Sequence, residues 1–126
     1  MSFAVIMLAL LAGQCAPCVH YTPHVVDLRG RLIATVRYGP PNYGENPNSD
    51  ERVRVWLLRL SKPLDMCSDQ NGDRISGVRE VQVFFQHDAS KFRGKLVRVR
   101  GSLEEATLGP EFTKVVMYAR SIESDP

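Results

Sequence analysis

Alternation of apolar and polar residues with a period of two is the feature that most constrains this chain. Successive side chains of a strand point to opposite faces, so the alternation predicts strands with one buried face. In the first such segment Val26, Leu28 and Leu32 alternate with charged residues, and Gly30 predicts a bulge or a sharp bend. The expected strands cover residues 25–38, 52–60, 78–86, 95–106 and 112–123.

A short helical turn is expected between the third and the fourth of these strands. The segment HDASKFRG (87–94) offers Asp88 as an N-cap and Gly94 as a stop signal. Five strands with one short helix in this place favour an all-β fold, a five-stranded OB-like Greek-key barrel. A small β-sandwich is the competing architecture. The length of 126 residues suits one domain, which we place at residues 18–126.

The N-terminal segment differs from the rest of the chain. Residues 1–26 contain no Lys, Arg, Asp or Glu, and SFAVIMLALLAG (2–13) is almost wholly apolar. Such a run fits the apolar region of a signal peptide and is too short to span a bilayer. We therefore predict a cleaved signal peptide over residues 1–17, and a mature chain without a transmembrane span in the bacterial periplasm or outside the cell. A buried core helix is the alternative.

The three cysteines are interpreted in the light of this export. Cys15 falls in or near the segment to be cleaved, which leaves Cys18 and Cys67 in the mature chain. Two cysteines in an oxidising compartment pair, so we predict a Cys18–Cys67 disulfide that stabilises the fold by about 2–4 kcal/mol. If the chain is not cleaved, Cys15 and Cys18 together with His20 and His24 form a candidate metal cluster instead.

A series of short motifs extends over residues 18–122. They are CVHYTP (18–23), VVDLRGRL (25–32), GPPNY (39–43), VWLLRLSKP (55–63), VREVQV (78–83) and GKLVRVRGSL (94–103). In this order, and with Cys67, they resemble the bacterial exported family known as domain of unknown function 4431. The resemblance implies export and a compact β domain, and it supplies no reaction. The family's histidines before the last strand are absent from TLGPEFT (107–113), so no metal site is carried over.

The segment DQNGDRISGVRE (69–80) resembles a twelve-residue calcium loop. Asp69, Asn71, Asp73 and Glu80 stand at the first, third, fifth and twelfth positions, where oxygen ligands are needed. The sixth position, which requires a sharp turn, is Arg rather than Gly. A polar turn is therefore the simpler interpretation, and a calcium- or small-ligand-binding periplasmic domain is our alternative function.

Arginines at outward strand positions raise the question of nucleic-acid binding, which OB barrels perform with a basic face and stacking aromatics. A net charge of +2 and interleaved acidic residues speak against it, so no nucleic-acid partner is expected. No serine lies in a nucleophile motif, and we expect neither catalysis nor a cofactor. The arginines in question are Arg29, Arg31, Arg37, Arg52, Arg54, Arg98 and Arg100.

The loop GPPNYGENPNSD (39–50) is unusually long for a connection between strands. Its three prolines stiffen it, Tyr43 is its only aromatic residue, and the first loop of an OB barrel flanks the usual ligand face. We therefore predict a non-enzymatic binding module for an envelope or secreted protein or glycan, with Asn42, Tyr43 and Trp56 as contacts. Alternatively, Tyr43 folds back and caps the barrel.

Overall fold

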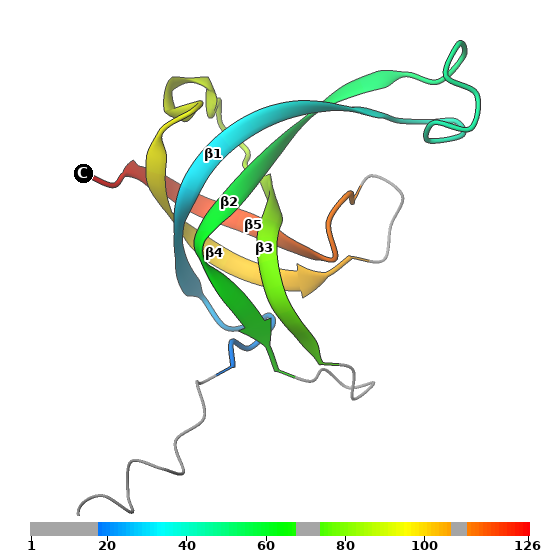
Figure 1. Cartoon of the computed structure of the whole chain (residues 1–126). Coiled ribbons are helices and arrows are strands. Elements are labelled where there is room, and N and C mark those ends of the chain that lie inside the picture. The colour runs from blue at the N-terminus through cyan, green and yellow to red at the C-terminus, as the bar shows by residue number, and fades with distance from the viewer. Residues whose placement is uncertain (1–17, 68–73, 107–110) are drawn as a thin grey trace, which may run out of the picture.

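The protein folds into a closed barrel of five strands, as the computed structural model shows for residues 18–67, 74–106 and 111–126 (Figure 1). This confirms the all-β prediction and excludes the sandwich. The strands are β1 (Val26–Tyr38), β2 (Arg52–Met66), β3 (Ile75–Phe84), β4 (Leu96–Glu105) and β5 (Val115–Ser124).

The order of the strands around the barrel is β1-β2-β3-β5-β4, and β4 pairs with β1 to close it. Every pairing is antiparallel except that of β3 with β5. The long first strand serves two neighbours: residues 26–31 pair with β4 and residues 30–38 pair with β2. Barrel closure therefore depends on β1 changing its partner midway along its length.

Gly30 lies at the point where β1 changes partner. Its Cα is opposite Leu60 of β2 and Val97 of β4, and β1 curves around the barrel there (Figure 1). A Cβ atom built at this position would collide with the carbonyl oxygen of Arg59. The glycine predicted to bend the first strand is thus required for the close approach of two backbones.

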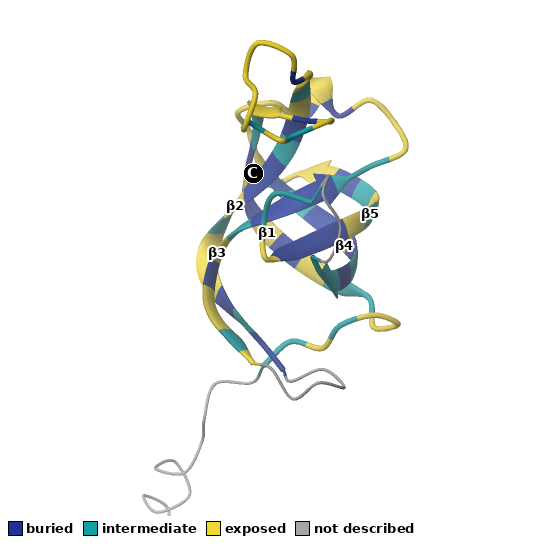
Figure 2. Cartoon of the chain, turned by 90° about the vertical axis from the view of Figure 1, so that its right-hand side faces the viewer, coloured by how far each residue is buried: buried dark blue, intermediate teal, exposed yellow. Residues whose placement is uncertain are grey.

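The barrel interior is filled by the inward residues of all five strands. Buried and exposed positions alternate along the ribbons, as the colouring in Figure 2 shows. This alternation is what the period of two predicted. The largest core side chains, with less than 2% of their surface exposed, are Leu32, Leu58, Met66, Val81, Val97, Val99, Leu103, Val115 and Met117.

The short helix predicted within residues 87–94 is only a three-residue 3-10 turn (Ser90–Phe92). The Oδ1 atom of Asp88 accepts hydrogen bonds from both the amide and the hydroxyl of Ser90, which closes a tight turn. Gly94 N then donates to Leu32 O at 2.7 Å and returns the chain to β1. In the described ranges no helix is long and apolar enough to span a bilayer.

The second strand continues to Met66, beyond the predicted end at residue 60. Register shifts relative to β3 lie between Arg59 and Leu64 and between Leu64 and Met66. These irregularities accommodate the Ser-Lys-Pro sequence, which as a sequence signal indicates the end of a strand. The extension brings the end of β2 to the N-terminal arm, residues 18–24.

The N-terminal arm is attached to the end of β2 by a disulfide and by backbone hydrogen bonds. Cys18 pairs with Cys67, as predicted. Val19 N donates to Asp65 O and Cys67 N donates to Val19 O, both at 2.8 Å. Val19 and Tyr21 pack against the barrel core. A disulfide is consistent with an extracellular or periplasmic location.

We expect Gly30→Ala to destabilise the protein strongly, by about 3 kcal/mol or more, because the new methyl group collides with backbone that cannot move without breaking a ladder. Urea unfolding monitored by Trp fluorescence measures the loss. Gly77→Ala is the matched control: a Cβ there meets no atom within 4 Å, and only its positive φ of 67° costs about 1 kcal/mol. Equal losses in the two variants would contradict the role given to Gly30.

Candidate functional site: an aromatic hollow on the outer face

The loop between β1 and β2, residues 39–51, is organised around the buried carboxylate of Asp50. This carboxylate accepts hydrogen bonds from the backbone amides of Asn42 at 2.9 Å, Gly44 at 2.8 Å and Asn46 at 3.1 Å. At the base of the loop Gly39 N donates to Glu51 O at 2.6 Å. Hydrogen bonds accepted by Asp50 and Glu51, the last two residues of the loop, therefore fold it into a compact unit.

The same hydrogen bonds determine the acidity of Asp50. Burial acts to raise the pKa of its carboxyl group, but the amides of Gly44, Asn42 and Asn46 outweigh burial and hold the pKa below the ordinary value of 3.8. Asp50 is consequently ionised at neutral pH, with its charge stabilised by amide dipoles of the loop.

Tyr43 is positioned by this loop geometry. Its backbone has a φ of 52°, a conformation that few residues other than Gly adopt, and its amide donates to Gly39 O at 2.9 Å. The ring lies near that of Phe112, with 6.4 Å between centroids, and the residue remains 43% exposed. The loop thus brings an exposed tyrosine against the segment that precedes β5.

A hollow of about 180 Å³ lies between the loop, β2, β3 and the segment before β5. Val53, Val55, Gln82 and Phe84 contribute to it from strand positions that alternate with inward residues, so the hollow is on the outside of the barrel. Its lining residues are Gly39, Pro40, Tyr43, Val53, Arg54, Val55, Gln82, Phe84 and Phe112.

A second apolar layer lies outside the barrel core, at and beside the hollow. Val55, Leu57 and Val116 are at most 3% exposed but do not belong to the core cluster. Leu57 and Val116 flank Gln82 in the pairings of β3 with its two neighbours. The chain itself therefore covers this part of the outer face, and of the three only Val55 lines the hollow.

Gln82 attaches the segment before β5 to the edge of the hollow. Its side-chain Oε1 accepts a hydrogen bond from Phe112 N at 2.6 Å, and its backbone amide donates to Thr113 Oγ1 at 2.9 Å. The Thr113 hydroxyl in turn donates to Val115 O at 2.6 Å. Phe112 is therefore held in place by a buried polar network, as Tyr43 is held by Asp50.

Tyr118 extends the aromatic surface beyond the hollow. Phe84 stacks on Tyr118 of β5 with 5.3 Å between centroids, and Tyr118 is 41% exposed. Burial, followed by the negative charges of Glu104 and Glu111, raises the pKa of the Tyr118 hydroxyl, which keeps it protonated as a hydrogen-bond donor. The outer face thus carries four aromatic rings contributed by loops and strands.

The structure brings together only part of the predicted contact set. Asn42 and Tyr43 lie in the loop, as their positions required. Trp56 lies on the other face of β2, opposite Ala34, where it packs against the core. Phe84 and Phe112 were missed; the outward phase of Phe84, which follows the inward Val83, was a signal in the sequence, whereas the placement of Phe112 depends on Gln82.

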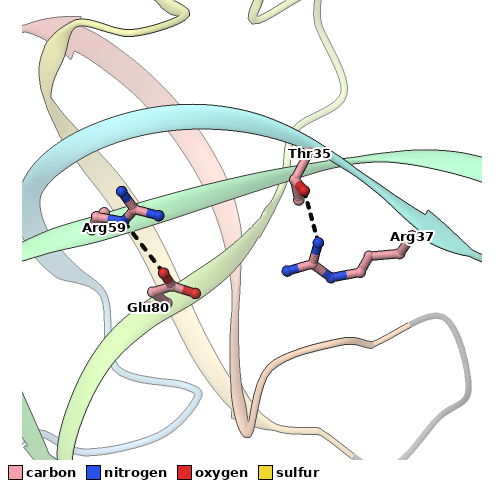
Figure 3. Close-up of polar contacts among 4 residues, drawn as sticks. All are labelled: Thr35, Arg37, Arg59 and Glu80. Carbon is pink, nitrogen blue, oxygen red and sulfur yellow. Dashed lines mark hydrogen bonds and ion pairs between the residues drawn. The ribbon is translucent and has the colours of Figure 1, made fainter.

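Four of the exposed arginines face acidic residues across neighbouring strands or the C-terminal tail. The closest pair, Arg59 with Glu80 at 3.3 Å, is drawn in Figure 3, together with Arg37 donating to Thr35 Oγ1 at 2.7 Å. The others are Arg29–Asp125, Arg98–Glu123 and Arg100–Asp27. Paired charges at 3.3–3.9 Å reduce the positive field that a nucleic-acid surface requires.

Of the four predicted calcium ligands, the structure describes only Glu80. Asp69, Asn71 and Asp73 lie outside the described residues. Glu80 is in β3, where it pairs with Arg59. Among the residues that the structure describes, no group of three or more His, Cys, Asp or Glu side chains is arranged to hold a metal ion. The calcium interpretation stays a prediction.

Comparison with known proteins adds no assignment: no family model and no curated protein matches this sequence. The resemblance to domain of unknown function 4431 therefore stays a prediction. What the site can do is inferred from its geometry.

We expect Asp50→Asn to loosen the 39–51 loop, because an amide replaces an ionised acceptor that three backbone amides share. Hydrogen exchange at Asn42, Gly44 and Asn46 should accelerate, while exchange in the barrel strands stays slow. Glu45→Gln, an exposed change in the same loop, is the control. Unchanged exchange in Asp50→Asn would contradict the role of this carboxylate.

The same loop should loosen in acid. The pKa of Asp50 is lower in the folded chain than in the unfolded chain, so its contribution to stability is complete above the unfolded value near 3.8. This contribution is lost as the pH falls through the folded pKa. Titration of the Gly44 amide resonance by NMR should therefore report a midpoint below 3.8; a midpoint above it would reverse the sign of the proposed effect.

Proposed function

We propose that the chain is a non-enzymatic binding module of the OB type that engages a glycan of the cell envelope or of a secreted partner. The order β1-β2-β3-β5-β4 with a parallel β3–β5 pair supports the OB assignment, because this is the arrangement of a five-stranded Greek-key barrel with a shared first strand. The barrel provides a rigid frame for ligand contacts made by its loops.

The observation that carries the proposal is the aromatic hollow. In OB barrels the face of the second and third strands, with the first and last inter-strand loops, receives oligosaccharides and oligonucleotides. Here Tyr43 comes from the first of these loops, Phe112 from the last, and Phe84 from β3. Ring faces at such a site stack on the apolar face of a sugar, while paired charges elsewhere disfavour a polyanion.

The polar chemistry near the hollow supports binding rather than a reaction. The side-chain oxygen of Gln82 is already engaged by Phe112 N, and the Asp50 carboxylate is occupied by the loop amides. Both groups act as internal supports, which suits a site that must be preorganised. The ligand would therefore be held by ring faces and by exposed groups such as the Tyr118 hydroxyl.

Export belongs to the same proposal. Residues 1–17 would act as a cleaved signal peptide and deliver the domain to the periplasm or beyond, where glycans are accessible. The Cys18–Cys67 disulfide supports an oxidising compartment. The motifs that resemble domain of unknown function 4431 are in keeping with this destination.

We expect neutral envelope oligosaccharides to shift the NMR resonances of the loop 39–51, of β3 and of Phe112. Tyr43→Ala and Phe112→Ala should each weaken binding about tenfold or more, because each removes one stacking face. Leu96→Ala is the control, since Leu96 is 47% exposed but lies outside the hollow. No shifts with any oligosaccharide, or shifts confined to another face, would reject the glycan proposal.

A further inference from the structure

The disulfide at the end of β2 has an asymmetric environment. Cys67 is buried, with 7% of its surface exposed, whereas Cys18 is half-buried. The Nε2 atom of His20 lies 3.8 Å from the sulfur of Cys67. The His20 ring also packs on that of His24, with 5.0 Å between centroids. Cys18 is therefore the more exposed residue of the pair, and the sulfur of Cys67 has an imidazole neighbour.

This asymmetry has a chemical consequence for thiol–disulfide exchange. In exchange a thiolate attacks one sulfur, and the other sulfur leaves as a thiolate. Attack is favoured at the accessible sulfur, and departure is favoured where the leaving thiolate is stabilised. An imidazole N–H next to a sulfur stabilises its thiolate form by a hydrogen bond, whereas burial in apolar surroundings does the opposite. Without His20, the buried Cys67 would be a poor leaving group.

We propose that the Cys18–Cys67 disulfide is a thiol–disulfide exchange site for a partner that carries an exposed cysteine thiolate. The partner thiolate attacks Cys18 Sγ and forms a mixed disulfide with it. The bond between the two chain sulfurs breaks, and its electron pair leaves on Cys67 Sγ. The imidazole of His20, whose Nε2 lies 3.8 Å from this sulfur, stabilises the leaving thiolate by a hydrogen bond, and the thiolate then takes a proton from solvent. Oxidation states balance, since one disulfide is exchanged for another and one thiol for another.

The surrounding fold permits this exchange without unfolding. The backbone hydrogen bonds of Val19 with Asp65 and Cys67 and the packing of Tyr21 against the core do not involve either sulfur. Thr22 N donates to Leu103 O at 2.8 Å and holds the arm on the opposite side. The arm can therefore carry a mixed disulfide at Cys18 while it remains on the barrel.

The exchange site is separate from the aromatic hollow. The second strand begins at Arg52 beside the 39–51 loop and ends at Met66 beside the arm, so the two sites lie at opposite ends of β2 (Figure 1). A partner attached through Cys18 would leave the hollow open. The exchange proposal thus stands independently of the glycan proposal.

The test is a single-turnover reaction of the oxidised full chain with excess reduced glutathione. A Cys15→Ser background leaves only the pair to react, and samples quenched with acid are examined by intact mass and peptide mapping. We expect the first product to carry glutathione on Cys18 and a free thiol on Cys67. His20→Gln should slow its formation about fivefold, as expected when the leaving thiolate loses the imidazole beside it.

Two further variants separate a charge effect from a structural one. His20→Lys supplies a charged N–H donor near the sulfur and should recover most of the rate, and His24→Gln, which removes the neighbouring ring but not the sulfur contact, should leave it unchanged. A thermal melt of each variant verifies that the compared proteins are folded. The proposal is overturned if glutathione attaches to Cys67, if His20→Gln reacts as fast as the parent, or if the pair reacts only after denaturation.

Discussion

The whole structure depends on one close backbone contact, that of Gly30 with the carbonyl of Arg59. Only a residue without a Cβ allows β1 to leave β4 and join β2 while both ladders stay intact. This change of partner closes the barrel, and closure removes the exposed sheet edges that an open five-stranded sheet would present. It also sends β1 and β2 outward beyond the barrel, where their connecting loop forms.

Each of the two sites depends on a polar group that supports a neighbour rather than a ligand. Asp50 uses its charge to hold three amides of the 39–51 loop, and Gln82 uses its amide oxygen to hold Phe112. His20 differs from both, because it is exposed and only lies 3.8 Å from the sulfur of Cys67. Buried polar groups are expensive unless they are satisfied, so such groups define one geometry for the residues that they support.

Local patterns predicted the strands well, because alternation reports directly which face of a strand is buried. Gly30 and the Cys18–Cys67 pair were predictable for similar reasons, the first from its place within a strand and the second from counting cysteines. The short 3-10 turn in place of a helix was not predictable in this way. Asp88 is as good a cap for a tight turn as for a helix, and the hydrogen bond of Gly94 to Leu32 favours the tight turn. For the same reason the sequence did not predict which face of β2 carries Trp56 or where Phe112 lies. Both depend on tertiary contacts: the packing of Trp56 against the core and the hydrogen bond between Phe112 and Gln82.

The loop 39–51 shows which features of a loop its amino-acid composition predicts and which it does not. Proline and glycine content indicates stiffness and turns, but not which direction Tyr43 faces. That direction follows from Asp50, which stands at the very end of the loop and acts on residues four to eight positions before it. A loop that is organised by its own Asp50 carboxylate can hold an exposed ring without support from the barrel core. Tyr43 does not fold back into the barrel: its ring lies near that of Phe112 on the outer face, and the residue stays 43% exposed, which is what the binding proposal uses.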